Sequence, residues 1–548
     1  DELGLRDNIG HGQDTRITIG LEYRLLKKLT ADIKYQYEGG YLDNRDLHDA
    51  KSFYARDVIN TFTQFLPDSS GVINNVPVGG VLITNNDKRS SHTFRGQLNY
   101  ADNWQEGRHS IAVIGGIELR DILNQTTLNS YYGYNDRTLL FIDLDKSASY
   151  PQFGQMFSLP FQFGGGVMDE LKHLQNRYAS FYSNASYTFL RRYTLSASGR
   201  MDKSSLFGVR PKDRNVPLWS AGASWDVHQE NFFRSQAISR LRLRTTYGFN
   251  GNVSPAQTAY PIAYTSIDPM TNLPSASIST PANPLLQWEK VSQINLGVDF
   301  GLFGNKLSGS VEWFVKNGQD LLGDHFLDPS SGFATIKANV ASMRGKGFDI
   351  ELNYRSGQVV VWDSRLIFSH ATDKVTKVAT VSTDNIFGGT QNYMSADRDI
   401  LPILNRPVYS VYSYRWAGLD NAGNPRLYDE KGTIGSYATI LNSLPPDQLV
   451  YNGPAQPTFF GGWNNNVSWR GFNLSATVTY KFGHKFRRSS INYYALNSNG
   501  IFRSTGHSDY ANRWKATGDE LITNVPAYVN YNNYDYNRDE AYRYADIL

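Results

Sequence analysis

Apolar and polar residues alternate along many segments of the chain, which is the pattern of a β-strand with two unlike faces. The alternation is clearest between residues 178 and 249. In four segments there, most of the alternate positions are apolar: Phe181 to Phe189, Tyr193 to Ala197, Trp219 to Val227 and Leu241 to Phe249. Arg240, Arg242 and Arg244 fill the alternate positions of the last one. Arginine interleaved with leucine indicates a wall with lipid on one side and water on the other.

Paired segments with the same alternation occur before and after this region. They are 17–25 with 29–37, 94–100 with 111–119, 294–300 with 307–315, 348–354 with 366–368, and 459–469 with 472–480. We predict about 14 strands, most of them near the roughly 10 residues that cross a bilayer at a tilt. The predicted fold is all-β, a transmembrane antiparallel β-barrel.

The connections between these strands alternate between short and long. The short ones are 26–28, 102–108, 190–192, 228–239, 301–306, 355–363 and 470–471. The long ones are 39–91, 121–177, 201–218, 250–289, 317–345 and 371–457. Outer-membrane barrels have short periplasmic turns and long extracellular loops. A soluble β-propeller would instead show a repeat of blade length, and the sequence shows none.

Composition is compatible with this fold. The chain has 548 residues, 40% of them hydrophobic, and a mean hydropathy of −0.45. No run of about 18 apolar residues predicts a transmembrane helix. The net charge of +3 gives no basic excess for a nucleic-acid partner. Cysteine is absent, which excludes disulfides and thiolate metal sites.

Motifs of catalysis are missing from the sequence. It contains no HExxH, GxSxG, Walker loop or GxGxxG, and its ten histidines are scattered. Carboxylates occupy polar strand positions, where we expect them to pair with Arg or Lys of the barrel lumen: Glu22, Glu118, Asp226, Asp299, Glu312 and Glu351. We predict no catalytic residue, no cofactor and no enzyme activity.

One loop has a faint likeness to a calcium site. Asp420 to Pro425, followed by Asp429 and Glu430, is rich in oxygen ligands. Calcium prefers carboxylates at alternate positions, and Ala422 and Pro425 break that register. An Asx turn, in which an Asp side chain accepts backbone hydrogen bonds, is the favoured interpretation, and calcium stays the alternative.

Aromatic residues fall into two groups. The first adjoins the short turns on the apolar face and is predicted to form an interfacial girdle: Tyr23, Tyr193, Trp225, Trp313, Trp469 and Phe472. The second lies in the long loops and supplies candidate contacts to a substrate or a partner, with loop packing as the alternative: Tyr131, Tyr132, Tyr393, Tyr414, Trp416, Tyr493 and Tyr494.

Several longer stretches carry a family resemblance. They are Gly199–Gly208, Leu241–Gly248, Gly251–Asn252, Asn283–Lys290, Asn295–Phe300, Met343–Gly347, Tyr414–Asp420, Phe460–Gly462 and Asn512–Lys515. In this order, and over nearly the whole chain, they resemble the SusC/RagA group of TonB-dependent outer-membrane transporters. The resemblance implies a barrel of about 22 strands, together with an N-terminal periplasmic domain and a plug. Neither of those is recognisable here, so we expect residues 1–548 to be part of a longer barrel chain.

The resemblance also implies a function. Its members import sizeable nutrients, oligosaccharides or peptides, with a SusD-like surface lipoprotein as lid and the TonB complex as energy source. The alternative is a structural subunit that holds a lipoprotein or an assembly complex at the outer membrane without import. A soluble glycan-binding protein is a third possibility, which the loop lengths disfavour. Arg240, Arg242 and Arg244 would meet plug carboxylates in the lumen.

Overall fold

The computed structural model describes most of the chain. The described residues are 2–66, 70–146, 148–153, 161–162, 169–205, 216–252, 258–268, 271, 273–378, 402–445, 448–493, 496, 506–530 and 535–548. They group into two compact units, which are treated separately below. The first comprises residues 1–102, 112–185 and 200–206, and the second comprises 103–111, 186–199 and 207–548.

Long strands follow one another in one large sheet, in the order of the chain. Along the path they are β1 (Arg6–Leu26), β2 (Leu29–His48), β5 (Gly80–Trp104), β6 (His109–Asn135), β10 (Glu170–Phe189), β11 (Tyr193–Ser204), β12 (Val216–Asp226), β13 (Ile238–Asn252), β16 (Glu289–Leu302), β17 (Leu307–Phe326), β18 (Thr335–Ser356), β19 (Val360–Lys377), β25 (Phe459–Trp469) and β26 (Phe472–Phe482). Neighbouring strands pair antiparallel, as in β1 with β2 and β25 with β26. The prediction of an all-β antiparallel wall of about 14 strands is confirmed.

The two faces of this sheet differ as the alternation predicts. On the apolar face, large side chains are exposed, for example Leu21, Leu98, Trp313, Trp463 and Leu474. Exposed apolar residues in regular alternation are the mark of a face that lipid covers. The other face, here called the polar face, carries charged and amide side chains.

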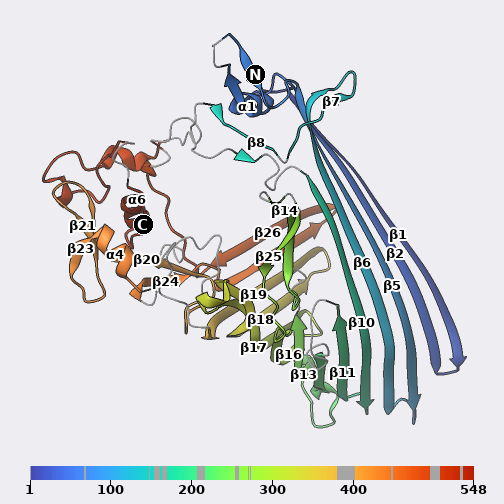
Figure 1. The fold of residues 1–548 in the computed structure, drawn as a ribbon. Helices are drawn as coiled ribbons and strands as arrows, with labels where there is room; N and C mark the ends of the chain where they lie inside the picture. Colours follow the sequence, from blue (N-terminus) through green and yellow to red (C-terminus); the bar gives the residue numbers. More distant parts are fainter. Residues whose placement is uncertain are drawn as a thin grey trace. The chain divides into compact units, whose positions relative to one another are not determined.

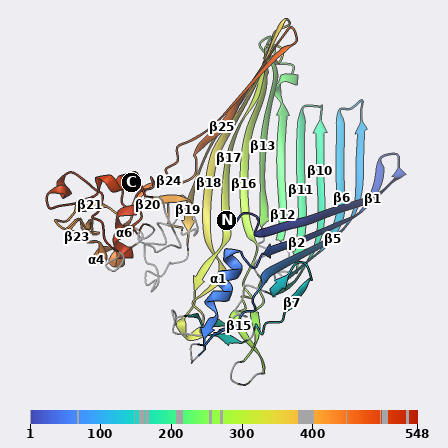
Figure 2. The same ribbon diagram turned by 90° about the horizontal axis from the view of Figure 1, so that it is seen from above.

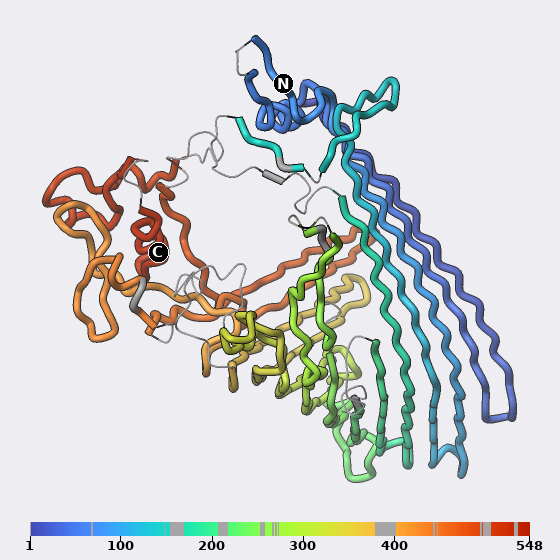
Figure 3. The backbone as a smooth tube through the Cα atoms, in the orientation of Figure 1, coloured from blue at the N-terminus to red at the C-terminus, as the bar shows by residue number. Residues whose placement is uncertain are grey.

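In the first unit, β1, β2, β5 and β6 run side by side over a great length, as Figures 1 and 3 show. Every residue of β1 from Arg6 to Arg24 pairs with β2 in one continuous register. The short elements of this unit are α1 (Phe53–Thr61), β3 (Thr63–Phe65), β4 (Val72–Asn74), β7 (Leu140–Ile142), β8 (Ser149–Tyr150) and β9 (Phe161–Gln162). Ser52 caps the N-terminus of helix α1, and its side chain accepts a hydrogen bond from the Ala55 amide.

In the second unit, β13, β16, β17 and β18 lie side by side (Figure 2). Its shorter elements are η2 (Val227–Gln229), β14 (Ile262–Ile267), β15 (Pro274–Thr280), η3 (Pro329–Ser331), β20 (Ser410–Ser413), β21 (Trp416–Leu419), β22 (Pro425–Tyr428), β23 (Ile434–Ser436), α4 (Tyr437–Ser443), β24 (Val450–Pro454), η5 (Ser508–Asn512), η6 (Asp519–Leu521) and α6 (Tyr536–Arg543). Those from β20 onward, outside the large sheet, form a group that we call the loop cluster, the described parts of 402–458 and 483–548.

The predicted short turns are confirmed. Strands are joined at 27–28, 105–108, 190–192, 303–306 and 470–471. The last is a two-residue hairpin turn in which Arg470 and Gly471 both have positive φ, at 45° and 89°. Such turns match the twist of the flanking strands.

The predicted long loops are wrong in their bounds. Residues 39–48 and 80–91 extend β2 and β5, and most of 317–345 belongs to β17 and β18, with only 327–334 between them. Beyond the lipid band both faces meet water, so the apolar alternation stops although backbone pairing continues, as between Phe326 and Thr335. Alternation alone therefore detects the lipid-crossing part of a strand and misses the rest.

Candidate functional site

A pocket of about 810 Å³ lies on the polar face of the second unit, between β16–β19 and the segments that follow β19. The wall contributes Asn295, Glu312, Phe314, Asp349 and Asp373. Alternation explains why these side chains share a face, since Glu312 stands directly opposite Asp349 in the register of β17 and β18. The opposite side of the pocket is formed by residues of the loop cluster, among them Pro407, Tyr409, Tyr451 and Gln456.

The loop side of this pocket is tied to the wall. The Val408 amide donates to Asp373 Oδ2 at 2.9 Å, and the Val375 amide donates to the Arg406 carbonyl at 2.8 Å. The guanidinium of Arg406 lies 4.4 Å from the ring centre of Tyr451. These contacts hold the aromatic side of the pocket in place without a covalent link.

The chemistry of the lining is mixed. Carboxylates and amides accept or donate hydrogen bonds, while Phe314 and the two tyrosines offer ring faces. The ammonium of Lys316 lies 5.1 Å from the Phe314 ring. Such a surface can bind a polar, extended ligand by hydrogen bonds and stacking.

Two of the three lumen arginines have partners in the wall itself. Arg242 makes a bidentate pair with Asp226, with Nε to Oδ1 at 2.7 Å and Nη2 to Oδ2 at 2.9 Å. Arg244 pairs with Asp299 at 2.9 and 2.8 Å and with Glu312 at 2.6 Å. The interpretation that the plug supplies their partners is therefore unnecessary for these two residues.

Arg240 differs from its neighbours. Its side chain is exposed, and no ion pair or side-chain hydrogen bond is formed by it within the described residues. For Arg240, pairing with a plug carboxylate stays a prediction.

A glycine permits the Arg244 pairs. Gly297 stands opposite Arg244 on one side and opposite Glu312 on the other. A Cβ at Gly297 would lie 3.2 Å from Arg244 Cζ and Nη2. The missing side chain therefore lets the guanidinium lie flat across the middle strand and reach the carboxylate beyond it.

The expected pairing of polar-face carboxylates is confirmed for most of them. Besides the pairs above, Glu118 lies 3.5 Å from Arg200, and Glu351 lies 3.0 Å from Arg365. Ion pairs between neighbouring strands stabilise a sheet modestly where water reaches them. For Glu22 the structure shows no ion pair among the described residues.

The girdle aromatics are exposed on the apolar face near the short turns, with Trp225 half-buried. Two of them share an acceptor, because the Tyr193 hydroxyl and Trp225 Nε1 both donate to Glu230, at 2.5 and 3.0 Å. Rings in the apolar band with polar tips directed to a turn are typical of a membrane interface.

Three of the candidate loop aromatics lie inside the loop cluster. Tyr414 and Tyr493 are 0% and 1% exposed, and Trp416 is half-buried between two apolar clusters. The Tyr493 hydroxyl donates to the Pro526 carbonyl at 2.7 Å, and Trp416 Nε1 donates to Asn524 at 3.0 Å. In this conformation the three side chains hold the cluster together, which was the alternative given above.

Of the other four candidate loop aromatics, the described ones lie in different surroundings. Tyr132 is 1% exposed and packs with Ala55 and Val81 beside α1, while Tyr131 lies on the other face of β6, with its ring 4.8 Å from Phe141. Tyr393 and Tyr494 lie outside the described residues. Contacts of all seven aromatics to a substrate or a partner stay a prediction.

The calcium-like loop has the hydrogen bonds of an Asx turn. Asp420 Oδ1 accepts from the amides of Ala422 and Asn424, at 2.9 and 2.8 Å. Asp429 Oδ1 does the same for Lys431 and Thr433 in the next turn. Among the described residues no group of three His, Asp or Glu side chains is arranged to hold a metal ion. Calcium binding by this loop stays the alternative.

A buried charged group on α6 was not predicted from the sequence. Arg538, Asp539 and Glu540 are each at most 5% exposed. Arg538 donates from Nε to Asn424 Oδ1 and from Nη2 to the Gly423 carbonyl, both at 2.8 Å, and Asp539 accepts from the Tyr493 amide at 2.9 Å. Three consecutive charges are typical of a solvated surface, and only the fold around α6 reveals their burial.

Burial changes the acidity of this group. Desolvation raises the pKa of Glu540 to about 7, although Arg543, 3.4 Å away, opposes the shift. The same cause lowers the pKa of Arg538. Figure 1 shows α6 beside α4, β21 and β23 of the loop cluster. Within the described part of the chain, no helix is long and apolar enough to cross a membrane.

Comparison with known proteins identifies the family. The family described as "TonB dependent receptor-like, beta-barrel" matches residues 7–442. The TonB-dependent receptor P3 of Formosa agariphila is 24% identical over 440 residues, which cover 77% of this chain and 41% of the relative. The TonB-dependent receptor SusC of Bacteroides thetaiotaomicron is 23% identical over 550 residues, covering 89% of this chain and 51% of SusC.

A solved structure agrees in fold. "Structure of the RagAB peptide transporter" superposes with a TM-score of 0.71 at 22% identity, covering 95% of this chain and 53% of that one. The chain spans about half the length of the curated relatives it matches. The alternating antiparallel wall and the family match across most of its length point the same way. The chain therefore belongs to the TonB-dependent receptor-like β-barrel family, is of the SusC and RagA type, and is an outer-membrane protein.

Proposed function

We propose that this chain forms the wall of an active importer that takes sizeable oligosaccharides or peptides across the outer membrane. The polar-face pocket carries the proposal. Its amides, carboxylates and rings suit hydrogen bonding and stacking with an extended polar molecule, and its position beside the folded loop cluster supports a role in receiving an incoming ligand.

The partners follow from the relatives. We propose that TonB energises import and that a SusD-like lipoprotein covers the external loops. The name of SusC supports the first point, and the likeness to RagAB, a peptide transporter, supports a two-component importer. The loop cluster is a packed platform on a rigid wall, which is the usual arrangement for recognition by loops.

Import on this proposal involves no covalent chemistry by the wall. The pocket binds the nutrient weakly enough to release it, and the energy for transport comes from TonB. The side chains lining the pocket set which nutrients are retained. The Asp226–Arg242 pair joins the neighbouring strands β12 and β13, and the Arg244–Glu312 pair joins β13 to β17 across β16.

Growth experiments test the proposal. Deleting the gene and supplying single glycans or peptides as nutrient identifies the substrate, and unimpaired growth on every candidate would favour the structural-subunit alternative. Complementation then uses Phe314→Ala with Asp349→Asn, both in the pocket, against Asp363→Asn, which lies on the same polar face of β19 outside it. We expect cells that carry the Phe314→Ala, Asp349→Asn variant to take up the nutrient more slowly at low concentration. Cells that carry Asp363→Asn should take it up at the rate of the unmutated protein.

A further inference from the structure

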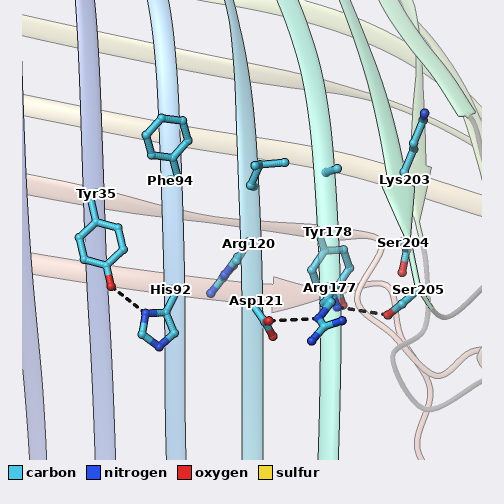
Figure 4. Close-up of a pocket in the computed structure, with 12 residues that line it drawn as sticks. Tyr35, His92, Phe94, Arg120, Asp121, Arg177, Tyr178, Lys203, Ser204 and Ser205 are labelled. Carbon is cyan, nitrogen blue, oxygen red and sulfur yellow. Dashed lines mark hydrogen bonds and ion pairs between the residues drawn. The ribbon is translucent and has the colours of Figure 1, made fainter.

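A second cavity, of about 460 Å³, lies on the apolar face of the first unit, bordered by β2, β5, β6, β10 and the end of β11 (Figure 4). Tyr35, Phe94 and Leu119 border it and are exposed on that face. It therefore opens toward the membrane and not toward the transport path. The import proposed above does not use it.

The position of this cavity along its strands corresponds to the edge of the hydrocarbon layer. Asp121 and Arg177 each lie 12 residues from the short-turn ends of their strands, and Lys203 lies 10 residues from its own. A tilted strand crosses the hydrocarbon in about 9–11 residues. Because the short turns are periplasmic in this fold, these charges stand at the external interface, among the lipid headgroups.

Two cations of the cavity have unused donors. Arg177 donates from Nε to Asp121 Oδ2 at 3.1 Å, and its side chain is 66% exposed (Figure 4). In the described part of the chain, its terminal nitrogens form no hydrogen bond, and the Lys203 ammonium contacts only the Phe181 ring, at 6.0 Å. Asp121 is already held by Gln175 at 2.9 and 3.0 Å. The cavity thus offers a net positive charge with free N–H groups.

The rest of the cavity is apolar. Phe94, Leu119 and Ala179 line it on the side of the hydrocarbon, and the small Ala179 leaves room beside Lys203. His92 completes the headgroup side of the cavity, with its Nδ1 2.7 Å from the Tyr35 hydroxyl. The cavity is therefore cationic on its headgroup side and apolar on its hydrocarbon side, which matches a molecule with an anionic head and a hydrocarbon tail.

We propose that this cavity binds the phosphate group of an outer-leaflet glycolipid, with one acyl chain against Phe94 and Leu119. The phosphate accepts hydrogen bonds from the terminal nitrogens of Arg177 and from the Lys203 ammonium. Charge-assisted bonds from arginine to phosphate are strong and directional, and partial exclusion of water beside the bilayer strengthens them.

Lipid retention tests the site. The protein is purified from outer membranes in mild detergent, and bound lipid is measured by native mass spectrometry and by organic phosphorus per protein. We expect the parent to retain a phosphorylated glycolipid and Arg177→Gln with Lys203→Gln to retain about tenfold less, as two charge-assisted hydrogen bonds at an exposed site are lost. Heat-shifted electrophoretic mobility shows whether each variant is folded, and Arg177→Lys with Lys203→Arg, which keeps both charges, should retain the lipid.

Arg344→Gln with Lys374→Gln is the matched control. These two cations stand opposite each other on β18 and β19 at positions of the apolar-face alternation, and neither borders this cavity. The control should retain lipid like the parent. Equal loss in the control, equal phosphorus in parent and double glutamine variant, or phosphorus NMR showing bound inorganic phosphate without lipid would each overturn the proposal.

Discussion

Gly297 is the position on which the Arg244 pairs of the polar face depend. Gly297→Val would place a side chain where the guanidinium now lies, 3.2 Å from the Cβ position, and would push Arg244 away from Glu312. We expect a loss of about 1–2 kcal/mol in the free energy of unfolding, because crowding a packed site costs about that much. Urea-induced unfolding in detergent micelles measures it.

Gly199→Val is the control for this prediction. Gly199 also lies within a long strand, but nothing stands within 4 Å of its Cβ position. The same substitution there should leave the stability nearly unchanged. Equal losses at the two positions would show that the cost comes from replacing a strand glycine and not from the ion pair.

Glu540 makes the loop cluster sensitive to pH. Its folded pKa of about 7 lies above the ordinary value of 4.5, so between these values the folded form holds a proton that the unfolded form has released. Stability of the cluster therefore falls as pH rises through this window, by about 3 kcal/mol in total. Glu540→Gln, which stays neutral, should remove this part of the slope between pH 5 and pH 8.

Hydrogen exchange of the α6 amides, corrected for intrinsic rates, measures this slope. Glu520→Gln is the comparison, since a hydrogen bond from Trp514 lowers the pKa of Glu520 and its contribution is lost only at more acid pH. The slope from pH 5 to pH 8 should be unchanged in that variant. A parent protein whose α6 protection does not fall over this range would contradict the prediction.

Among the elements, α6 is bonded to the turn between β21 and β22 through the side chain of Arg538, beside the apolar packing of Ala541 against Leu427. Arg538 donates to Asn424 Oδ1 and to the Gly423 carbonyl, and among the described residues of the helix no other side chain bonds either acceptor. We expect Arg538→Ala to destabilise the docked helix by about 3 kcal/mol, because Asn424 Oδ1 loses its donor, the Gly423 carbonyl keeps only the Ala527 amide, and a cavity is left. Limited proteolysis of the loop cluster would show faster cleavage near α6.

Arg543→Ala serves as the matched substitution on the same helix. Its side chain is 32% exposed, lies 3.4 Å from Glu540 and lies 5.8 Å from the ring centre of Tyr544, so it contributes through two long contacts. Cleavage should change little. If Arg543→Ala accelerates cleavage as much as Arg538→Ala, then loss of any helix charge, and not the docking bonds, explains the effect.

The whole molecule has a predicted orientation in the membrane, with short turns in the periplasm and the loop cluster outside. The chain contains no cysteine, so single cysteines can be introduced without background. We expect Lys431→Cys, in the turn between β22 and β23, to react with an impermeant maleimide on intact cells, and Lys27→Cys, in the β1–β2 turn, to react only after the outer membrane is opened. Labelling of Lys27→Cys on intact cells would contradict this orientation and indicate the opposite one.

The strands, their two faces and their short turns could be predicted from the amino-acid sequence alone. Side-chain direction alternates along every strand for purely local reasons, so Trp219, Ala221 and Ala223 had to share one face, as they do. The family stretches indicated the transporter type for a similar reason, because they lie in order along the chain. The strand ends beyond the lipid band could not be predicted, because both of their faces meet water and the sequence there shows no apolar alternation.

Contacts between distant segments could not be predicted in the same way. Tyr414 is buried because the chain returns more than a hundred residues later, when its amide donates to the Tyr544 carbonyl. The partners of Arg244, the burial of Glu540 and the cavity beside Arg177 depend equally on which strands and loops become neighbours. Local pattern specifies the direction of a side chain, whereas its partners, its burial and its acidity arise only when remote parts of the chain are brought together.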